Sequence, residues 1–423
     1  PLLPGINVTG KVSFSMAMFL GERSVASRHA KLSLISFAHL RFHDAQRALD
    51  ARSAPEERTA AAGFYATRDD RHIYLHPGFA HNTRGLLRLL GCDDSREQVT
   101  RQVRALDGSD LEQAIADAGL CGAMVRTPEE WDNSTVGKQL AARPVVDIVQ
   151  LDDSPPRPFP RNGDRPLSGI RVLDLTRVLA GPTCARTLAS YGASALRIGA
   201  GHLPTIPLFT VDTGFGKRCC HLDLREQEAA RTLNALIGEA DVFSQGYRTG
   251  VMERHGFGVS NVVARNPGIV YVSINCYGHE GDWRIRPGWE QLAPVVTGMT
   301  TVQGAHLGSD EPTLLPAALN DYTTGYLAAL GALAALKRRA THGGSYWVRV
   351  SLARTAVWAR QLGLRRAVNV KQVTPGEIRA ASATMNTAWG LLDYLRPAVT
   401  LSSSQVGWDR PPSPLGADSP HFE

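Results

Sequence analysis

The residue whose position most strongly suggests chemistry is Asp321. It follows the apolar stretch Leu314 to Leu319 and falls in the first turn of a long, nearly all-apolar helix predicted to run to Arg339. The dipole and free N–H groups of a helix N-terminus stabilise a carboxylate and should keep Asp321 ionised. A simple helix cap would show the same pattern. An ionised aspartate in this place is also how a protein would present a carboxylate nucleophile.

A second candidate site is the predicted strand, loop and helix from Leu173 to Tyr191. Asp174 stands at the end of the strand, and Gly181 and Pro182 open the helix, whose first N–H groups would face an anion. No G-x-G-x-x-G follows the strand and the chain has no G-x-x-x-x-G-K-[ST], so neither a dinucleotide fingerprint nor a nucleotide triphosphate loop is indicated. A tight turn without any ligand would have the same sequence.

Four cations fall at the ends of other predicted strands. Lys217 and Arg218 precede one strand, while Arg248 and Arg254 flank a turn after another. Each alone would be an ordinary solvated surface charge. Together they would place several groups that can bind phosphate on the loops of one sheet.

Composition places these residues in an ordinary globular protein. The chain has 423 residues, 43% apolar and 20% charged, which is enough for two or three domains. No apolar run approaches the roughly 18 to 20 residues of a membrane span, so no membrane partner is expected. The net charge is +6, but the arginines are scattered without a basic tract, and no nucleic-acid partner is predicted. Six cysteines without a CxxC pair or zinc spacing indicate no metal and a reducing, cytoplasmic location.

The N-terminus allows two interpretations. The chain begins without Met, and Lys11 precedes the apolar stretch Val12 to Leu20, which resembles a short signal peptide. An N-terminally truncated chain explains the missing Met equally well.

The order of predicted helices and strands changes at a proline-rich linker over residues 152–166. Five prolines in this segment exclude a helix or a central strand. Residues 1–151 predict a small α+β unit, with helices at 83–90 and 110–118 and a strand at 72–76. Beyond the linker, strands and helices alternate as in βαβ units, which predicts an α/β domain over 167–363 with a Rossmann-like parallel sheet and helices on both faces. Residues 364–423 predict a C-terminal helix and an extended tail. The predicted strands of the large domain are 170–175, 195–198, 219–224, 242–244, 269–276 and 345–352, and its helices are 182–191, 227–237 and 322–339.

Six motifs occur in an order that resembles the family III CoA-transferases of the CaiB/BaiF type, which include formyl-CoA transferase and carnitine CoA-transferase. They are the segments 167–182, 192–198, 216–224, 240–250 and 267–273, and the pair Asp321-x-x-x-Gly325. The resemblance covers residues 165–363. Residues 64–151 resemble the small domain of the same family, which normally follows the half that carries the nucleophile. The order here implies a fused, double-copy variant. If the chain is truncated at its N-terminus, residues 1–50 would be the end of a first large-domain copy.

The resemblance implies an enzyme that moves CoA between an acyl-CoA thioester and a free carboxylic acid. Asp321 matches the nucleophilic aspartate of the family and would form an aspartyl-CoA thioester. Trp289 matches a position that is aromatic in transferases and is the proton-abstracting histidine in the α-methylacyl-CoA racemases; a tryptophan cannot act as that base. Glu290 matches an acidic position at the edge of the active site. Coenzyme A is then a substrate and no metal is required.

The resemblance also implies which residues bind CoA: Val178, Lys217, Gly246 and Arg254. Two segments depart from the family pattern, because Ile198-Gly-Ala-Gly201 replaces an Ile-Glu-x-Pro and Gln245-Gly246 replaces a Glu-Asn. These missing contacts keep a catalytically degenerate CoA-binding subunit as one alternative, and a racemase-like isomerase of the same fold, which Trp289 disfavours, is another. Relatives form interlocked dimers, which implies a homodimer or an intrachain pseudo-dimer. The sequence leaves the acyl-CoA donor and the carboxylic acid acceptor unassigned.

Overall fold

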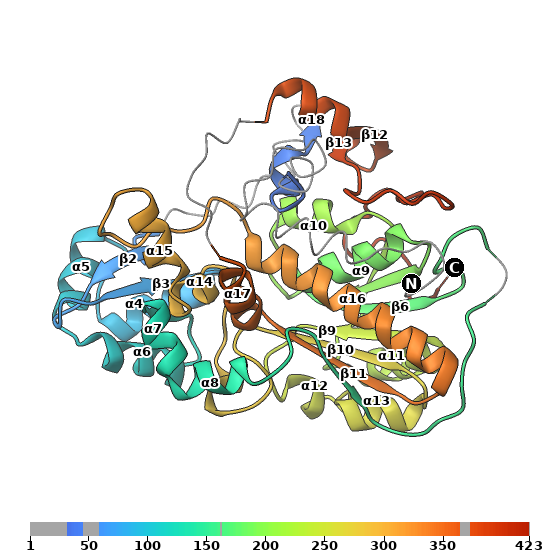
Figure 1. Ribbon diagram of the computed structural model, residues 1–423, viewed down its shortest axis with the longest axis horizontal. Coiled ribbons are helices and arrows are strands. Elements are labelled where there is room, and N and C mark those ends of the chain that lie inside the picture. The colour runs from blue at the N-terminus through green and yellow to red at the C-terminus, as the bar shows by residue number, and fades with distance from the viewer. Residues whose placement is uncertain (1–31, 45–58, 161–162, 364–372, 423) are drawn as a thin grey trace.

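The computed structural model describes residues 32–44, 59–160, 163–363 and 373–422, and its largest feature is a seven-stranded sheet (Figure 1). The strand order is β5-β11-β10-β9-β6-β7-β8, and every neighbouring pair is parallel except β5 with β11. This confirms the predicted α/β class. The strands are β5 (Asp147–Gln150), β6 (Arg171–Leu175), β7 (Ser194–Gly199), β8 (Lys217–His221), β9 (Val242–Gln245), β10 (Val270–Asn275) and β11 (Tyr346–Ser351).

Helices cover both faces of this sheet because its strands are apolar on both sides. On β6, Val172 faces one buried cluster with α9 and α16, whereas Leu173 and Leu175 face a second cluster with α11 and α13. Alternation along a strand sends neighbouring side chains to opposite faces, so the domain has three layers. The helices of this domain are α9 (Ala180–Ser190), α10 (Pro207–Gly214), α11 (Gln227–Glu239), α12 (Val251–Arg254), α13 (Val259–Arg265), α16 (Leu319–His342) and α17 (Leu352–Gln361).

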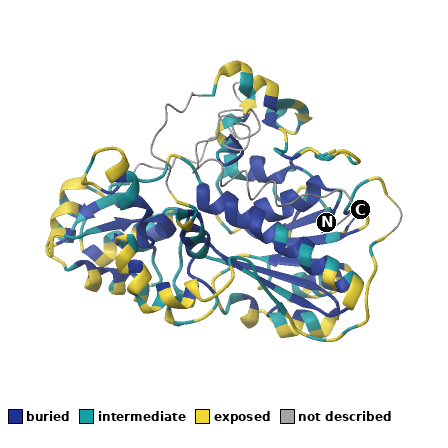
Figure 2. Ribbon diagram, in the orientation of Figure 1, coloured by how far each residue is buried: buried dark blue, intermediate teal, exposed yellow. Residues whose placement is uncertain are grey.

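The long helix α16 lies in the interior and packs closely on α9. Most of its 24 residues are buried, as its dark colour in Figure 2 shows. Gly325 makes the close packing possible, because a Cβ atom there would lie 2.4 Å from the carbonyl oxygen of Ala180. The spacing between Asp321 and Gly325 therefore places the aspartate one turn before the point where the two helices touch.

The smaller unit is built on an antiparallel sheet of β2 (Gly63–Ala66), β3 (His72–Leu75) and β4 (Gly122–Met124). It has its own apolar core, which includes Ile73 and Leu86. Helices α14 and α15 come from the later part of the chain but lie against this unit in Figure 1. Its helices are α4 (Ala80–Leu90), α5 (Arg96–Arg104), α6 (Gly108–Asp117), α7 (Pro128–Asn133), α8 (Thr135–Ala141), α14 (Leu292–Val296) and α15 (Met299–His306), with a 3-10 turn at η2 (Asp282–Ile285).

The division of the chain differs from the expected boundary at residue 151. Strand β5 precedes the linker but pairs with β11, so the chain already joins the large sheet at Asp147. The four-residue strand is too short for its period to reveal which sheet it joins. The linker itself, where the structure describes it, contains no helix or strand, in keeping with its prolines.

The C-terminal region contains the expected helix, α18 (Pro375–Ala381), and also a hairpin that the sequence did not predict. Its strands, β12 (Ser382–Thr387) and β13 (Gly390–Leu395), form a sheet with β1 (Arg41–Phe42), which follows the 3-10 turn η1 (Ser36–His39). The extended tail then runs beside β8, where Gly216 N donates to Arg410 O and Asp418 N donates to Cys219 O, at 3.0 and 2.9 Å. The tail thus covers the edge of the sheet.

The predicted strands and helices of the large domain are confirmed, with ends that differ by a few residues. The candidate signal peptide at residues 11–20 lies outside the described residues. No helix in the described ranges is long and apolar enough to cross a membrane.

Candidate active site

Asp321 is the third residue of α16 and lies at the wall of a large cavity, which we call the main cavity. Its side chain is buried, with the residue only 6% exposed. The next residue, Tyr322, points away into the core and donates a 2.9 Å hydrogen bond to Asp212, which pairs with Arg186 at 2.8 Å. This buried network holds the first turn of α16, so Asp321 is presented from a rigid support.

Glu290 takes up the free N–H groups at the start of α16. Its Oε1 accepts 3.1 Å hydrogen bonds from Asn320 N and Asn320 Nδ2, and its Oε2 accepts from Asp321 N. The expectation that these amides serve Asp321 is therefore wrong. Burial raises the pKa of Asp321 to about 7. Burial and then repulsion from Asp321 raise the pKa of Glu290, against the three N–H donors. The two carboxyl groups titrate as a pair in the neutral range rather than staying fully ionised.

Trp289 forms one end of the cavity, beside the two carboxyl groups. Its ring stacks on His76 with centroids 4.9 Å apart and meets Phe79 edge to face at 5.1 Å. Gly78 passes beneath the ring at φ +60°, where a Cβ atom would lie 2.9 Å from Trp289. His76 Nε2 lies 2.8 Å from Gln291 Oε1. Three residues of the small unit thus fix a tryptophan of the later chain, so the site forms where the two units meet.

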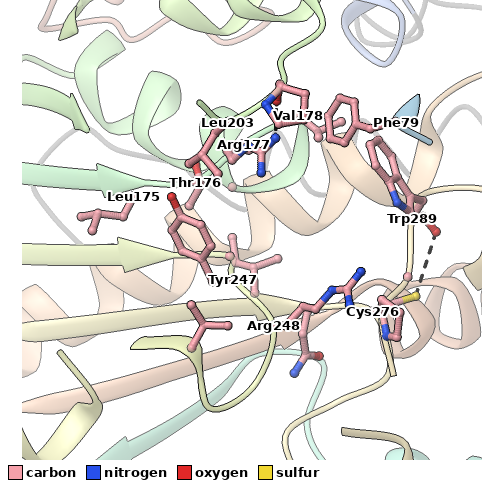
Figure 3. Close-up of a pocket in the computed structure, with 18 of the residues that line it drawn as sticks. Phe79, Leu175, Thr176, Arg177, Val178, Leu203, Tyr247, Arg248, Cys276 and Trp289 are labelled. Atoms are coloured by element: carbon pink, nitrogen blue, oxygen red, sulfur yellow. Dashed lines mark hydrogen bonds between the residues drawn. The ribbon is translucent and has the colours of Figure 1, made fainter. Parts of the chain in front are cut away.

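The main cavity has a volume of about 740 Å³ and extends from Asp321 and Trp289 to two arginines, Arg177 and Arg248. Figure 3 shows these two side chains on opposite sides of the cavity, with Trp289 and Phe79 at one end. Among the residues that the structure describes, neither guanidinium pairs with a carboxylate. Arg177 Nη2 donates to Pro204 O, and its guanidinium carbon lies 5.1 Å from the centre of the Phe79 ring. Burial, and then the charges of Arg248 and Arg177, lower the pKa of the nearby His81. The part of the cavity around His81 and the two arginines is therefore positive and suits an anionic ligand.

The loop between β6 and α9 borders the same cavity. The backbone of Val178 adopts φ +68°. This left-handed conformation costs a β-branched residue roughly 1–3 kcal/mol, and strained residues of this kind are found mainly at functional sites. The first residues of α9, Ala180 and Gly181, also line the cavity, as the sequence predicted for the N-terminus of this helix. The loop places its own backbone and the positive N-terminal end of α9 at the wall of the cavity.

Lys217 does not reach this cavity, and the expectation that it contacts CoA is wrong in this structure. Its side chain has no exposed area, and its Nζ lies 2.6 Å from Asp174 Oδ2 and 2.8 Å from Pro182 O. Burial lowers the pKa of this lysine, and the Asp174 carboxylate acts in the opposite direction. Thr176 Oγ1 donates to the other oxygen of Asp174. The lysine therefore braces the two ends of the loop that carries Val178.

The remaining candidates divide between the cavity and its surroundings. Gly246 lines the cavity together with Val178, Trp289, Glu290 and Asp321. Arg254 is an exposed residue at the end of α12 and is not among the lining residues, although Val251 and His255 of the same segment are. Its contact with CoA stays a prediction.

A second cavity of about 300 Å³ adjoins the first and shares Val178, Leu179, Trp289, Glu290 and Asp321 with it. Its other walls come from residues 35–37, the start of α10, and the loop before α16. The sequence did not indicate this cavity or Arg177, because both depend on segments far apart in the chain. The only local signal was the position of Arg177 between Asp174 and the start of the next helix.

Comparison with known proteins bears on this arrangement. The model of CoA-transferase family III matches residues 167–388, which is just over half of the chain. The chain belongs to CoA-transferase family III. This membership confirms the resemblance carried by the motifs, and the matched region contains the cavity's arginines, Trp289, Glu290 and Asp321.

Individual relatives are similar over part of their length. An acyl-CoA transferase of Gibberella moniliformis is 35% identical over 62% of this family III chain and 48% of its own. The acetyl-coenzyme A transferase nodX of Hypoxylon pulicicidum is 34% identical over 71% of this chain and 54% of its own. The chain thus spans about half the length of these curated relatives. The crystal structure of a hypothetical protein (Rv3272) from Mycobacterium tuberculosis has 30% identity and a TM-score of 0.44 over 49% of this chain and 57% of its own.

Proposed function

We propose that this protein transfers CoA from an acyl-CoA thioester to a free carboxylic acid, with Asp321 as the nucleophile. The observation that carries the proposal is the position of Asp321 at the junction of two cavities. One cavity has two arginines without a described carboxylate partner, and the other is mostly apolar. An acyl-CoA thioester has two parts that match these cavities, because its nucleotide carries negatively charged phosphates and its acyl chain carries none. A thioester that spans both cavities would bring its carbonyl carbon next to Asp321.

The proposed reaction has four steps, and the last one returns Asp321 to its free carboxylate. An Asp321 oxygen attacks the thioester carbonyl, the C–S bond breaks, and CoA leaves as thiolate from a mixed anhydride. The thiolate attacks the Asp321 carbonyl, which releases the first acid as carboxylate and leaves an aspartyl-CoA thioester. The acceptor carboxylate attacks that thioester to form a second anhydride and free the thiolate. The thiolate finally attacks the acceptor's carbonyl, giving the new acyl-CoA and restoring Asp321.

Arg177 and Arg248 are the proposed phosphate contacts, in place of Lys217. Both line the positive end of the main cavity and lack a described carboxylate partner, so a phosphate would supply the missing counter-charge. Arg248 also reaches the small unit, since its Nη1 would lie 3.3 Å from a Cβ atom on Gly119. A bound phosphate there would join the two units around the substrate.

Glu290 and Trp289 have supporting roles in the proposed site. Glu290 holds the first turn of α16 through its hydrogen bonds to Asn320 and Asp321, so it positions the nucleophile. Trp289 closes the space beside the carbonyl and would keep water from the anhydride, which water would otherwise hydrolyse. Neither residue needs to transfer a proton in the proposed steps, because both substrates and products are carboxylates or thioesters.

Exchange of a labelled acid into its own acyl-CoA tests the proposal. Labelled butyrate, hexanoate, octanoate and succinate would each be incubated with the matching acyl-CoA and the protein. We expect incorporation of label with at least one pair, and a loss of at least 1,000-fold in D321N, because one essential nucleophile is removed. The control is D310N, the same change at an exposed aspartate outside both cavities. Equal exchange by D321N and D310N would refute the assignment of the nucleophile.

A further inference from the structure

The cavity on the far side of Trp289 has walls that differ in chemistry from those of the main cavity. Most of its surface is aliphatic or aromatic, and Phe37 and Phe209 meet edge to face there with centroids 4.7 Å apart. The apolar side chains in these walls include Ile35, Phe37, Ile206, Phe209, Leu314 and Ala317.

The charges that reach this cavity are all acidic. Asp321 and Glu290 stand at its entrance, and no lysine or arginine is among its described lining residues. The other polar groups are His76 and Gln291, which bond to each other. Burial lowers the pKa of His76 to about 4, so its imidazole is neutral at pH 7. A ligand carboxylate inside this cavity would therefore have no cation to pair with, and burying it would be costly.

The size of the cavity limits the ligand. Its volume of about 300 Å³ is roughly twice that of an engineered apolar cavity that binds benzene. By that comparison it has room for a chain of roughly six to twelve carbon atoms. A two-carbon acyl group would leave most of the space empty.

We infer that this second cavity binds the acyl group of the substrate and selects an uncharged, medium-length apolar acyl chain over a short acyl group or a dicarboxylate. The inference rests on the proposed function, because only a thioester at Asp321 would send its acyl chain past Trp289. The shared residues Val178 and Trp289 mark the passage between the two cavities. The acyl-CoA that this protein consumes would come from a reaction that activates a free medium-chain fatty acid.

Binding of S-alkyl-CoA thioethers tests this inference without requiring turnover. Isothermal titration calorimetry would compare CoA, S-ethyl-CoA, S-hexyl-CoA, S-octyl-CoA, S-dodecyl-CoA and S-(5-carboxypentyl)-CoA on the whole protein. Affinity should rise about fourfold per methylene group up to S-octyl-CoA, as expected for burial of apolar surface. S-(5-carboxypentyl)-CoA should bind at least tenfold more weakly than S-hexyl-CoA.

Two variants assign the effect to this cavity. A317L places three additional carbon atoms in the wall of this cavity. It should reduce the ratio of the affinities for S-octyl-CoA and S-ethyl-CoA at least tenfold and leave the Kd of CoA unchanged. F209A enlarges the cavity and should move the optimum to longer chains. A142L is the matched control, because it makes the same change at an exposed alanine that lines neither cavity.

The possible results separate the inference from the proposed function. If CoA binds but alkyl chains add no affinity, or A317L and A142L behave alike, the inference is refuted and the proposed function is untouched. Preference for the carboxylated thioether would likewise overturn it. Failure of CoA and of every thioether to bind would refute the proposed function and this inference with it. Should A317L not fold, which circular dichroism would reveal, the chain-length series of the unchanged protein and F209A still decides.

Discussion

The burial of Asp321 predicts how the rate of transfer depends on pH. Burial raises its pKa from 3.8 to about 7, and only the ionised form can attack a thioester. Asp321 and Glu290 titrate as a pair, and a first ionisation of that pair at about pH 7 gives a reactive fraction of about nine tenths at pH 8 and about one tenth at pH 6. The value of kcat/KM for cleavage of the donor should fall about tenfold over the same interval. An aspartate with an ordinary pKa would stay ionised throughout, and the profile would be flat.

The assay is release of free acid from hexanoyl-CoA in the first turnover, followed from pH 5.5 to 8.5 at constant ionic strength. The pyrophosphate of CoA stays ionised in this range, but its 3′-phosphate takes up a second proton at about pH 6. The same profile measured with the dephospho-CoA thioester, which lacks that phosphate, then reports the titration of the free enzyme. D321N run in parallel gives the uncatalysed hydrolysis, which is subtracted. A flat profile with Asp321 still required for release would refute the reasoning about its burial. Unchanged far-ultraviolet circular dichroism across the range would exclude acid unfolding as the cause.

Three further predictions concern the charges around the site. K217M should lower the free energy of unfolding by about 3 to 5 kcal/mol, because it leaves the buried Asp174 carboxylate without a cation. D174N in the same chain should restore most of that loss. A K217M protein of full stability with weakened CoA binding would contradict the buried role of Lys217. D321N should raise the free energy of unfolding, measured in urea, because the raised pKa of Asp321 means that its ionisation disfavours the folded state. This gain in stability should grow from pH 4 to pH 7 and then stay level at up to about 4 kcal/mol. A gain that does not depend on pH would contradict the prediction. R177Q and R248Q should each weaken CoA about tenfold or more and leave pantetheine, which has no nucleotide phosphates, unchanged; equal weakening of both ligands would remove the phosphate assignment.

Periodicity predicted the elements of the large domain well because its parallel strands are apolar on both faces and alternate with clear helices. Asp321 was found for the same reason, since it stands where an apolar run meets a helix. Its protonation was not predictable from that position. The sequence does not show that Glu290, 31 residues earlier, returns to occupy the helix amides.

Lys217 illustrates the limit of placing charges from sequence alone. A lysine at the start of a predicted strand is usually exposed. Here the partner that allows its burial, Asp174, lies 43 residues earlier and two strands away in the sheet. The second cavity has the same origin, since residues 35–37, α10 and the loop before α16 meet only in the folded chain.

Trapping of the covalent thioester between Asp321 and CoA tests the central claim most directly. The protein would be incubated with hexanoyl-CoA and then with hydroxylamine, which converts an aspartyl-CoA thioester into a hydroxamate, and the modified peptide would be located by mass spectrometry. We predict a hydroxamate on Asp321 that requires the acyl-CoA and is absent from D321N. Modification of another carboxylate, or transfer of CoA without any modification of Asp321, would contradict the account.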